Sequence, residues 1–310
     1  MRPIAKNERL AVAIPTRNRH AHLSVAIGAL LQQTYANWML VINDSSDVPV
    51  ESSDLLSVLF ALVRRAGHQV RIIYTDSGSD RHQSAMDAVP RGIELIVRMD
   101  DDVMPAPSFL ENVVRPFRLF PNKPLAATGG CYPETHQKPL RLETSLRDRR
   151  WVRDLHAPEW PLNGWRLQGH HYREQQILET GSLLGHAICY RRSAVRKVGG
   201  WAVEGYSRQA HREESDLCAR LGAAGFEMMV ATDAIAWHLY APEGGSREVL
   251  KLGEKKVLTS DGAPIHSDEK LFWKRFKRLP KRPARNWKRY DLSGHALYER
   301  PVRGVAKEPR

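Results

Sequence analysis

Three adjacent carboxylates occur in the segment ELIVRMDDD, where Asp100, Asp101 and Asp102 follow an apolar run. Two like charges about 4 Å apart repel each other by roughly 1 kcal/mol in water and by roughly 4 kcal/mol at an effective dielectric constant of about 20. A bound cation offsets this repulsion. Asp100 and Asp102 can both face one ion where the strand ends, and such oxygen ligands suit Mg²⁺ or Mn²⁺. The alternative is a solvated acidic turn that caps the helix expected near Pro107.

The elements that would position these carboxylates alternate between short apolar runs and helical patterns over the first 130 residues. Strands are expected at 10–14, 39–43, 70–74 and 94–99, and helices at 20–33, 54–67, 80–89 and 107–117. Strands that alternate with helices across short links indicate a parallel sheet covered by helices. Ligands of such sheets bind at the carboxyl ends of the strands. The pattern therefore predicts one rim that carries Pro15, Asp44, Asp76 and the Asp100–Asp102 cluster.

Beyond residue 130 the pattern is first lost and then returns. We interpret residues 131–180 as irregular structure over the sheet, either a lid or an acceptor-side segment, because they are rich in Trp, His, Arg and Pro, including Trp151, Trp160, Trp165, His170 and His171. A strand, a short helix and a glycine pair are expected within 181–200, a helix at 214–226, and one or two strands at 227–238.

The composition favours a protein with a substantial core and no membrane-spanning segment. Of the 310 residues 42% are hydrophobic, yet no apolar run approaches the roughly 18 residues of a transmembrane helix. The start of the chain has neither the long apolar run nor the cleavage site of a signal peptide. Cys131, Cys189 and Cys218 have no CxxC spacing and are expected to be reduced. These features predict a cytoplasmic protein, with peripheral membrane attachment as an option.

The positive charge is concentrated at the carboxyl end. The net charge is +12, of which residues 270–310 carry +11. The stretch 271–290 interleaves Lys and Arg with aromatic residues, namely Phe272, Trp273, Phe276, Trp287 and Tyr290. Cations and rings together suit DNA, through phosphate contacts and base stacking, or an anionic membrane surface. The other interpretation is a basic segment that packs on the body of the protein.

Six segments resemble, in the same order, the motifs of glycosyltransferase family 2. They are AVAIPTRNR (11–19), QQTYANWMLVINDSSD (32–47), RMDDDVMP (98–105), CYRRSAVRKVGGW (189–201), HREESDLCARLGAAGF (211–226) and AIAWH (234–238). The resemblance implies a GT-A fold of the α/β class, with a Rossmann-like, mostly parallel sheet flanked by helices. The expected division is a glycosyltransferase domain at 1–242, made of a nucleotide-binding half (1–130) and an acceptor-side half (131–242), followed by a basic extension at 243–310.

The resemblance implies a divalent cation and a nucleoside-diphosphate sugar at the rim. Asp100 and Asp102 match the family's DxD motif, with Asp102 as the direct metal ligand, and His238 matches a histidine that completes a site for Mn²⁺ or Mg²⁺. Donor contacts are expected from Pro15, Thr16, Arg17, Asp44, Arg81, Asp100 and Asp101. The chain departs from the family at Arg81-His82-Gln83, where an Arg-Asn pair is usual.

The resemblance also implies a general base at the start of the helix expected at 214–226. Glu213 and Glu214 match the family's Glu-Asp motif, and we favour Glu214 as the base that deprotonates the acceptor hydroxyl. A positioned base contributes about 10²–10⁴-fold to the rate, and a helix N-terminus keeps it ionised. The structural alternative is an acid that caps the helix, with Asp216 and Arg220 as an i, i+4 pair.

The function predicted in this way is inverting sugar transfer to a hydroxyl of an envelope glycan, a lipid-linked acceptor or a modified DNA base. Two other classes stay open from the sequence. One is a non-catalytic nucleic-acid-binding protein that keeps the fold, and the other is a nucleotidyltransferase, which also handles nucleotides with a metal ion.

Overall fold

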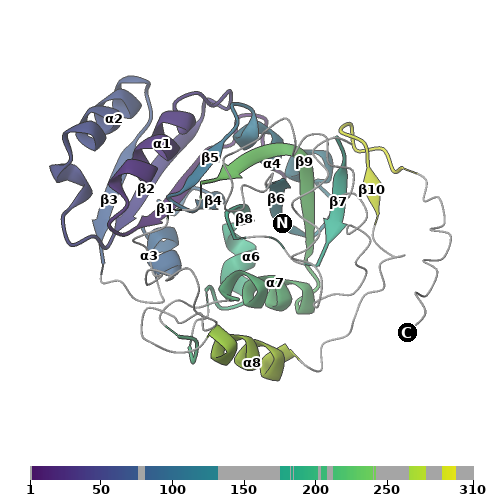
Figure 1. Cartoon of the computed structure of the whole chain (residues 1–310). Helices are drawn as coiled ribbons and strands as arrows, with labels where there is room; N and C mark the ends of the chain where they lie inside the picture. Colours follow the sequence, from purple (N-terminus) through teal and green to yellow (C-terminus); the bar gives the residue numbers. More distant parts are fainter. Residues whose placement is uncertain are drawn as a thin grey trace, which may run out of the picture.

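The strands form one sheet in the order β10-β7-β9-β6-β8-β4-β1-β2-β3, and β5 pairs with β9 beside it (Figure 1). The structure is a computed structural model that describes residues 2–75, 81–131, 175–181, 183, 185–201, 204–207, 212–239, 241, 265–276 and 288–297. The strands are β1 (Leu10–Thr16), β2 (Trp38–Asp44), β3 (Val70–Tyr74), β4 (Leu95–Met99), β5 (Val103–Pro105), β6 (Leu125–Cys131), β7 (Ile177–Thr180), β8 (Ala187–Arg191), β9 (Glu227–His238) and β10 (Arg289–Tyr290).

The amino-terminal half of the sheet is parallel, since β4, β1, β2 and β3 all run in the same direction. β6 and β9 are also parallel to each other, whereas β8, β7 and β10 run antiparallel to their neighbours. The predicted fold class, an α/β protein with a mostly parallel central sheet flanked by helices, is confirmed. The reversal at β8 matters for the site, because it places Ala187 at the start of β8 opposite Met99 at the end of β4.

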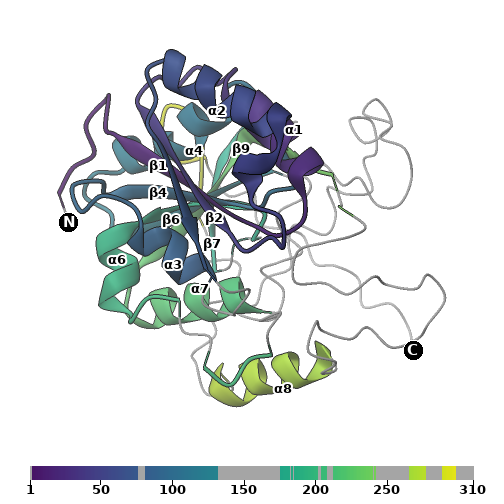
Figure 2. The same cartoon turned by 90° about the vertical axis from the view of Figure 1, so that its left-hand side faces the viewer.

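Helices cover both faces of the sheet (Figure 2). α1, α2 and α4 pack on the face where Leu10, Val12 and Ile14 lie, and α3, α6 and α7 pack on the face where Ala11 and Ala13 lie. Because both faces are covered, β1 and β2 are buried along their whole length, which explains their unbroken apolar sequences. The helices are α1 (His20–Leu30), α2 (Asp54–Arg65), α3 (Arg81–Asp87), α4 (Phe109–Leu119), α6 (Arg192–Lys197), α7 (Glu213–Ala223) and α8 (Ile265–Phe276), with a 3₁₀ turn at Val50–Ser52.

Local signals set the ends of the helices. The Ser53 side chain caps α2 by accepting a hydrogen bond from the backbone N–H of Leu56 at 3.5 Å. α7 is followed by Gly225, whose φ of 82° is left-handed and favours glycine. The strands and helices expected over the first 130 residues are confirmed, although their bounds differ by a few residues. β5, β6, β7, β10 and α8 were not expected, and residues 227–238 form one strand.

The described part of the basic tail packs against the body. Phe272 and Phe276 of α8 are buried beside Tyr206 and Ala219, and the pairing of β10 with β7 buries Tyr290. This corrects the expectation that these three rings contact nucleic acid or lipid, because they are already covered by the protein. No helix among the described residues is long and apolar enough to span a membrane. Outside the described residues lie Asp76, Trp151, Trp160, Trp165, His170, His171 and Trp287.

Candidate active site at the strand ends

The three aspartates between β4 and β5 differ in their main contacts, although Arg19 Nη1 reaches both Asp101 and Asp102, the latter at 3.4 Å. Asp101 is 3% exposed and points toward the end of β1. The Thr16 hydroxyl donates to Asp101 Oδ2 at 2.7 Å, and Arg19 Nη1 donates to Oδ1 at 3.0 Å. Burial raises the pKa of Asp101 to about 6, although the charge of Arg19 opposes this. Asp101, expected among the donor contacts, is therefore engaged inside the protein.

Asp102 lies against the end of β9 and is also buried. Its Oδ1 is 3.1 Å from His238 Nε2, and its Oδ2 accepts a hydrogen bond from the backbone N–H of Ala241 at 3.1 Å. Burial alone would raise the pKa of Asp102, but the hydrogen bond and the charge of His238 outweigh it and lower the pKa to about 2. Asp102 is thus a charged group fixed behind the imidazole of His238.

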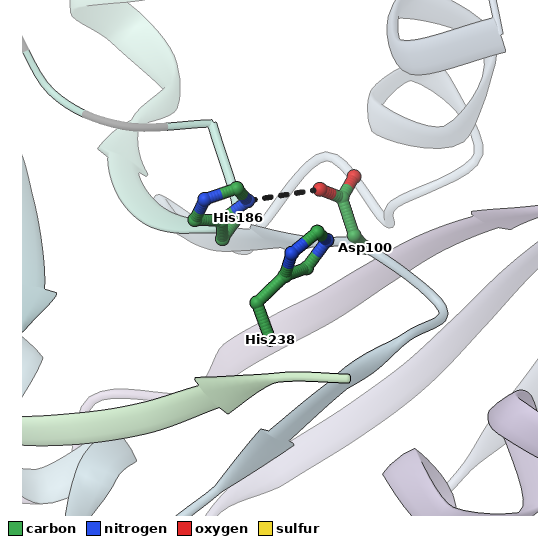
Figure 3. Close-up of side chains that lie close together, drawn as sticks. All are labelled: Asp100, His186 and His238. Carbon is green, nitrogen blue, oxygen red and sulfur yellow. Dashed lines mark ion pairs between the residues drawn. The ribbon is translucent and has the colours of Figure 1, made fainter. Parts of the chain in front are cut away.

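Asp100 lies together with two histidines, His186 and His238 (Figure 3). One ligand atom from each of the three side chains lies within 4.8 Å of the others. Asp100 Oδ2 is 3.6 Å from His186 Nδ1, and the two imidazole rings stack with centroids 4.1 Å apart. A carboxylate and two imidazoles are a donor set that fits a divalent cation. The fold therefore brings together the predicted Asp100 and His238 with an unpredicted His186.

Arg98 is the buried cation behind this cluster. It comes from the interior of β4, is 3% exposed, and places Nη2 2.9 Å from Asp100 Oδ1. The same nitrogen is 3.8 Å from a carboxylate oxygen of Glu213 and 3.8 Å from one of Glu214. Burial would raise the pKa of Asp100, but the guanidinium of Arg98 and the hydrogen bond with His186 hold it well below its usual range. One guanidinium thus faces three carboxylates.

His82 connects Arg98 to Glu213. Arg98 Nε donates to His82 Nδ1 at 3.0 Å, and His82 Nε2 is 2.7 Å from Glu213 Oε1. Burial, together with the charge of Arg98, lowers the pKa of His82 well below its ordinary value. Burial raises the pKa of Glu213 to about 7, against the opposing charges of Arg81 and Arg98. His82 Nε2 also lies 2.8 Å from Arg98 Nη2, so the residue that departs from the family pattern, His82, has structural partners on both sides.

Glu214 is the more exposed acid of the predicted base pair. Its side chain is 23% exposed, whereas that of Glu213 is 4% exposed. Glu214 passes directly over Gly185, where an added Cβ would lie 1.8 Å from Glu214 Oε1. Both acids belong to the first turn of α7, where the unpaired backbone N–H groups favour negative charge. Of these two acids, Glu214 is therefore the one that is open to solvent.

The remaining donor-side residues lie at the ends of β1, β2 and α3. Asp44 is 1% exposed and accepts hydrogen bonds from the backbone N–H groups of Ser46 and Val50, at 2.9 and 2.8 Å. It therefore orders the loop after β2. Arg17 is partly exposed, 3.8 Å from Asp47, and Arg81 Nη2 is 3.4 Å from Glu213 Oε1. Pro15 and Thr16 are the last two residues of β1, and both are buried.

His186 and Arg98 are the two functional candidates that sequence reasoning missed. A histidine before a strand start lies at the opposite rim in a parallel sheet, so only the antiparallel pairing of β8 with β4 brings His186 to Asp100. Arg98 occupies an apolar strand, where its charge had no assigned partner. A signal for it was present, because three acids in sequence need a compensating cation.

This fold and rim define an α/β protein whose strand ends carry a group of side chains that could hold a divalent cation. The family model described as "Glycosyltransferase like family 2" matches residues 7–255. The chain belongs to this family and is a glycosyltransferase, which confirms the predicted family and the predicted enzyme class. A comparison with curated protein sequences finds no match.

Several solved structures share the general architecture. A mannosyltransferase from Pyrobaculum calidifontis in complex with GDP-Man and Mn²⁺ is 16% identical, with a TM-score of 0.49, over 79% of this chain and 59% of that chain. S. aureus TarS is 14% identical, with a TM-score of 0.49, over 76% of this chain and 37% of that chain. The chain thus spans less than two thirds of either protein, and at this level of similarity neither says anything about its substrate.

Proposed function

We propose that the chain is an inverting, metal-dependent glycosyltransferase that moves a sugar from a nucleoside-diphosphate sugar to an acceptor hydroxyl. The observation that carries the proposal is the arrangement around Arg98. Its Nη2 is 2.9 Å from Asp100, a member of the cation-binding cluster, and 3.8 Å from Glu214. The proposed site for the counter-ion of a diphosphate and the proposed carboxylate base would therefore be adjacent on one rim, as transfer to a hydroxyl requires.

The donor is proposed to lie across the ends of β1, β2 and β4. Its nucleoside would lie beside the ends of β1 and β2, where the buried Pro15, Thr16 and Asp44 would shape the rim by holding the loops, and the partly exposed Arg17 and Arg81 would face the negative diphosphate. When bound at Asp100 and His238, a divalent cation neutralises the diphosphate and stabilises the charge that develops on the leaving group. The loop after β1 is held toward the loop after β2 by the Asn18 side chain, which donates to Asp47 at 2.8 Å.

Glu214 is proposed as the general base. Its exposed carboxylate would accept the proton of the acceptor hydroxyl, and the resulting oxygen would attack the anomeric carbon from the side opposite the diphosphate. This geometry inverts the configuration. Glu213, buried between His82 and Arg81, would hold the start of α7 in place rather than exchange protons with the acceptor.

The test is sugar transfer and donor hydrolysis with a panel of nucleotide sugars, with Mn²⁺ and with a chelator. We expect Glu214→Gln to lower kcat about 10²–10⁴-fold while the protein keeps its unfolding midpoint. The matched control is Glu111→Gln, an exposed acid of α4 that is paired only with Arg118 among the described contacts; it should resemble wild type. NMR of the product should show the inverted anomer. Equal rates for the two variants, or full activity with the chelator, would contradict the proposal.

The acceptor is proposed to be carried on a polyanionic partner, either anionic lipid with its envelope glycan or DNA with a modified base. In support, Lys270 and Lys274 are exposed on α8. Replacing both by Glu should weaken binding to DNA or to anionic vesicles and spare transfer to a small soluble acceptor. These substitutions are cleaner than truncation, which would also remove the buried Phe272 and Phe276. The division at residue 242 into a catalytic domain and a basic extension stays a proposal as well.

A further inference from the structure

We propose that His186 is a direct ligand of the divalent cation, together with Asp100 and His238, and that its second imidazole makes the site selective for Mn²⁺ and later first-row ions over Mg²⁺. In this arrangement Asp102 orients His238 instead of binding the ion. The inference rests on the proposed function in one respect only, namely that the bound ion would also contact the diphosphate of the sugar donor.

The placement of His186 follows from the topology of the sheet. β4 ends at Met99, β8 begins at Ala187, and the two residues are directly opposite each other in the antiparallel ladder. Asp100 follows the last residue of β4, and His186 precedes the first residue of β8, so both lie at the rim. The backbone N–H of Asp100 donates to the carbonyl of His186 at 2.8 Å. The two side chains are therefore held side by side by backbone hydrogen bonding rather than by a flexible loop.

The stacking of the two imidazoles brings the third donor to the same point. His238 ends β9, and its ring lies 4.1 Å from that of His186 at an angle of 21°. Figure 3 shows both rings on the same side of the Asp100 carboxylate. Oxygen and nitrogen donors that lie within 4.8 Å of one another can converge on one ion with small side-chain movements.

Two buried charges stand behind the ligands and orient them. Asp102 Oδ1 is 3.1 Å from His238 Nε2, so it can accept the proton of that nitrogen and fix the ring. Arg98 holds Asp100 Oδ1 at 2.9 Å, and this turns Oδ2 toward His186. Metal-binding histidines commonly donate their second nitrogen to a carboxylate in this way. Such a role explains why Asp102 is almost completely buried, although the DxD pattern suggests a ligand.

The donor set determines which ion fits. Mg²⁺ demands oxygen ligands and gives up its water reluctantly, whereas imidazole nitrogen suits the first-row transition ions. One carboxylate with two imidazoles is a mixed nitrogen and oxygen set. The sequence left Mn²⁺ and Mg²⁺ open. The donor set favours Mn²⁺ of these two, and it would also suit Co²⁺ or Fe²⁺.

The experiment measures metal binding without catalysis. Chelator-treated full-length protein is titrated with Mn²⁺, alone and with a nucleoside diphosphate, and the free ion is followed by its EPR signal. We expect His186→Ala to weaken Mn²⁺ binding on the order of 100-fold and Asp102→Asn by about 10–100-fold. The matched control, His295→Ala, removes a histidine whose side chain is 83% exposed beside Asp291 and should bind Mn²⁺ like wild type.

A spectroscopic readout separates ligation from a general loss of structure. Spin-echo modulation of bound Mn²⁺ should show two coordinated imidazole nitrogens in wild type and in Asp102→Asn, and one in His186→Ala. Mg²⁺ in large excess should fail to displace Mn²⁺ from wild type. The proposal is overturned if wild type binds no Mn²⁺ under either condition, if His186→Ala matches His295→Ala, or if Mg²⁺ competes equally. Mn²⁺ binding through His186 without sugar transfer would instead remove the proposed function and keep this inference.

Discussion

Two regions of the strand-end rim contain similar charged groups but expose them differently. In the inner region Thr16 and Arg19 both donate to Asp101, which is 3% exposed. In the outer region Arg98 faces several acids, and the side chains of Asp100 and Glu214 remain 27% and 23% exposed. Adjacent residues of one acidic triplet therefore face the interior and the exposed rim separately. Charge is present in both regions, and the difference between them is that only the outer acids have an accessible oxygen.

The largest expected effect comes from removing the cation of the outer region. Arg98→Met removes the guanidinium that faces Asp100, Glu213 and Glu214 and leaves Arg81 beside Glu213 alone. Breaking a buried ion pair on one side costs about 3–5 kcal/mol of unfolding free energy. Denaturant unfolding in the presence of a chelator measures this cost. The control is Arg115→Met, which interrupts the partly exposed pair with Asp233 and should cost less. Equal losses of unfolding free energy for the two variants would show that Arg98 stabilises the fold no more than an arginine in a single, partly exposed ion pair.

The second prediction separates the two regions. Asp101→Ala removes the acceptor of Thr16 and the partner of Arg19, and leaving buried donors unsatisfied costs about 1–3 kcal/mol. Its Mn²⁺ affinity should stay at the wild-type level, because Asp101 faces away from His186 and His238. Asp100→Ala should differ in its metal binding, with weak Mn²⁺ affinity, and should also cost stability because it removes the partner of the buried Arg98. If both variants lose Mn²⁺ binding equally, the division between inner and outer regions is wrong.

The parts of the fold that the sequence could predict are those set by local pattern. The run VRIIY predicts β3 with its observed bounds, because its β-branched and aromatic residues favour a strand, and β3 lies half-exposed at the edge of the sheet. Asp100 and His238 were predicted through the family resemblance, and the structure places them together. His186 could not be found in this way, since its position depends on the antiparallel pairing of β8, a long-range feature.

The basic tail shows a second reason for an incomplete prediction. Aromatic residues interleaved with cations fit an external polyanion and equally fit a helix that packs one side on the protein. α8 uses Phe272 and Phe276 for packing and leaves Lys270 and Lys274 exposed. Spacing of four residues places both rings on one side of a helix, so the pattern was compatible with burial. Only tertiary contacts decide between the two interpretations.

The third prediction uses the pH to sharpen the comparison. The pKa of Glu213 is raised from 4.5 to about 7, so the folded protein holds this proton more tightly than the unfolded chain. Its stabilising contribution is complete below 4.5 and is lost as the pH rises through about 7. The slope is at most about 1.4 kcal/mol per pH unit. Glu213→Gln should remove it, so the difference in unfolding free energy between wild type and variant should change across this interval. A constant difference would show that Glu213 does not titrate there.

The smallest effect is expected where α8 meets the start of α7. Arg275 Nη1 is 3.1 Å from Asp216 Oδ2, and its guanidinium lies over the Tyr206 ring at 4.9 Å. Asp216 also accepts from Tyr206 at 2.9 Å and from Arg220 at 2.7 Å, so it keeps two partners when Arg275 is removed. The Arg275 side chain is 30% exposed, and solvent screening therefore limits the cost of Arg275→Ala to about 1 kcal/mol.

A small loss of stability at this contact can still lower activity, because Asp216 lies in the same first turn of α7 as Glu214. If the tail helix helps to hold that turn, Arg275→Ala should lower kcat by less than about 10-fold, with little change in the donor KM. Arg275→Lys should recover part of the loss. With a small soluble acceptor, whose use does not depend on the α8 lysines, the neighbouring exposed Lys274→Ala gives the baseline, since it changes the charge of α8 without touching α7. Identical kcat values for Arg275→Ala and Lys274→Ala would show that α8 packs on the domain without influencing the base.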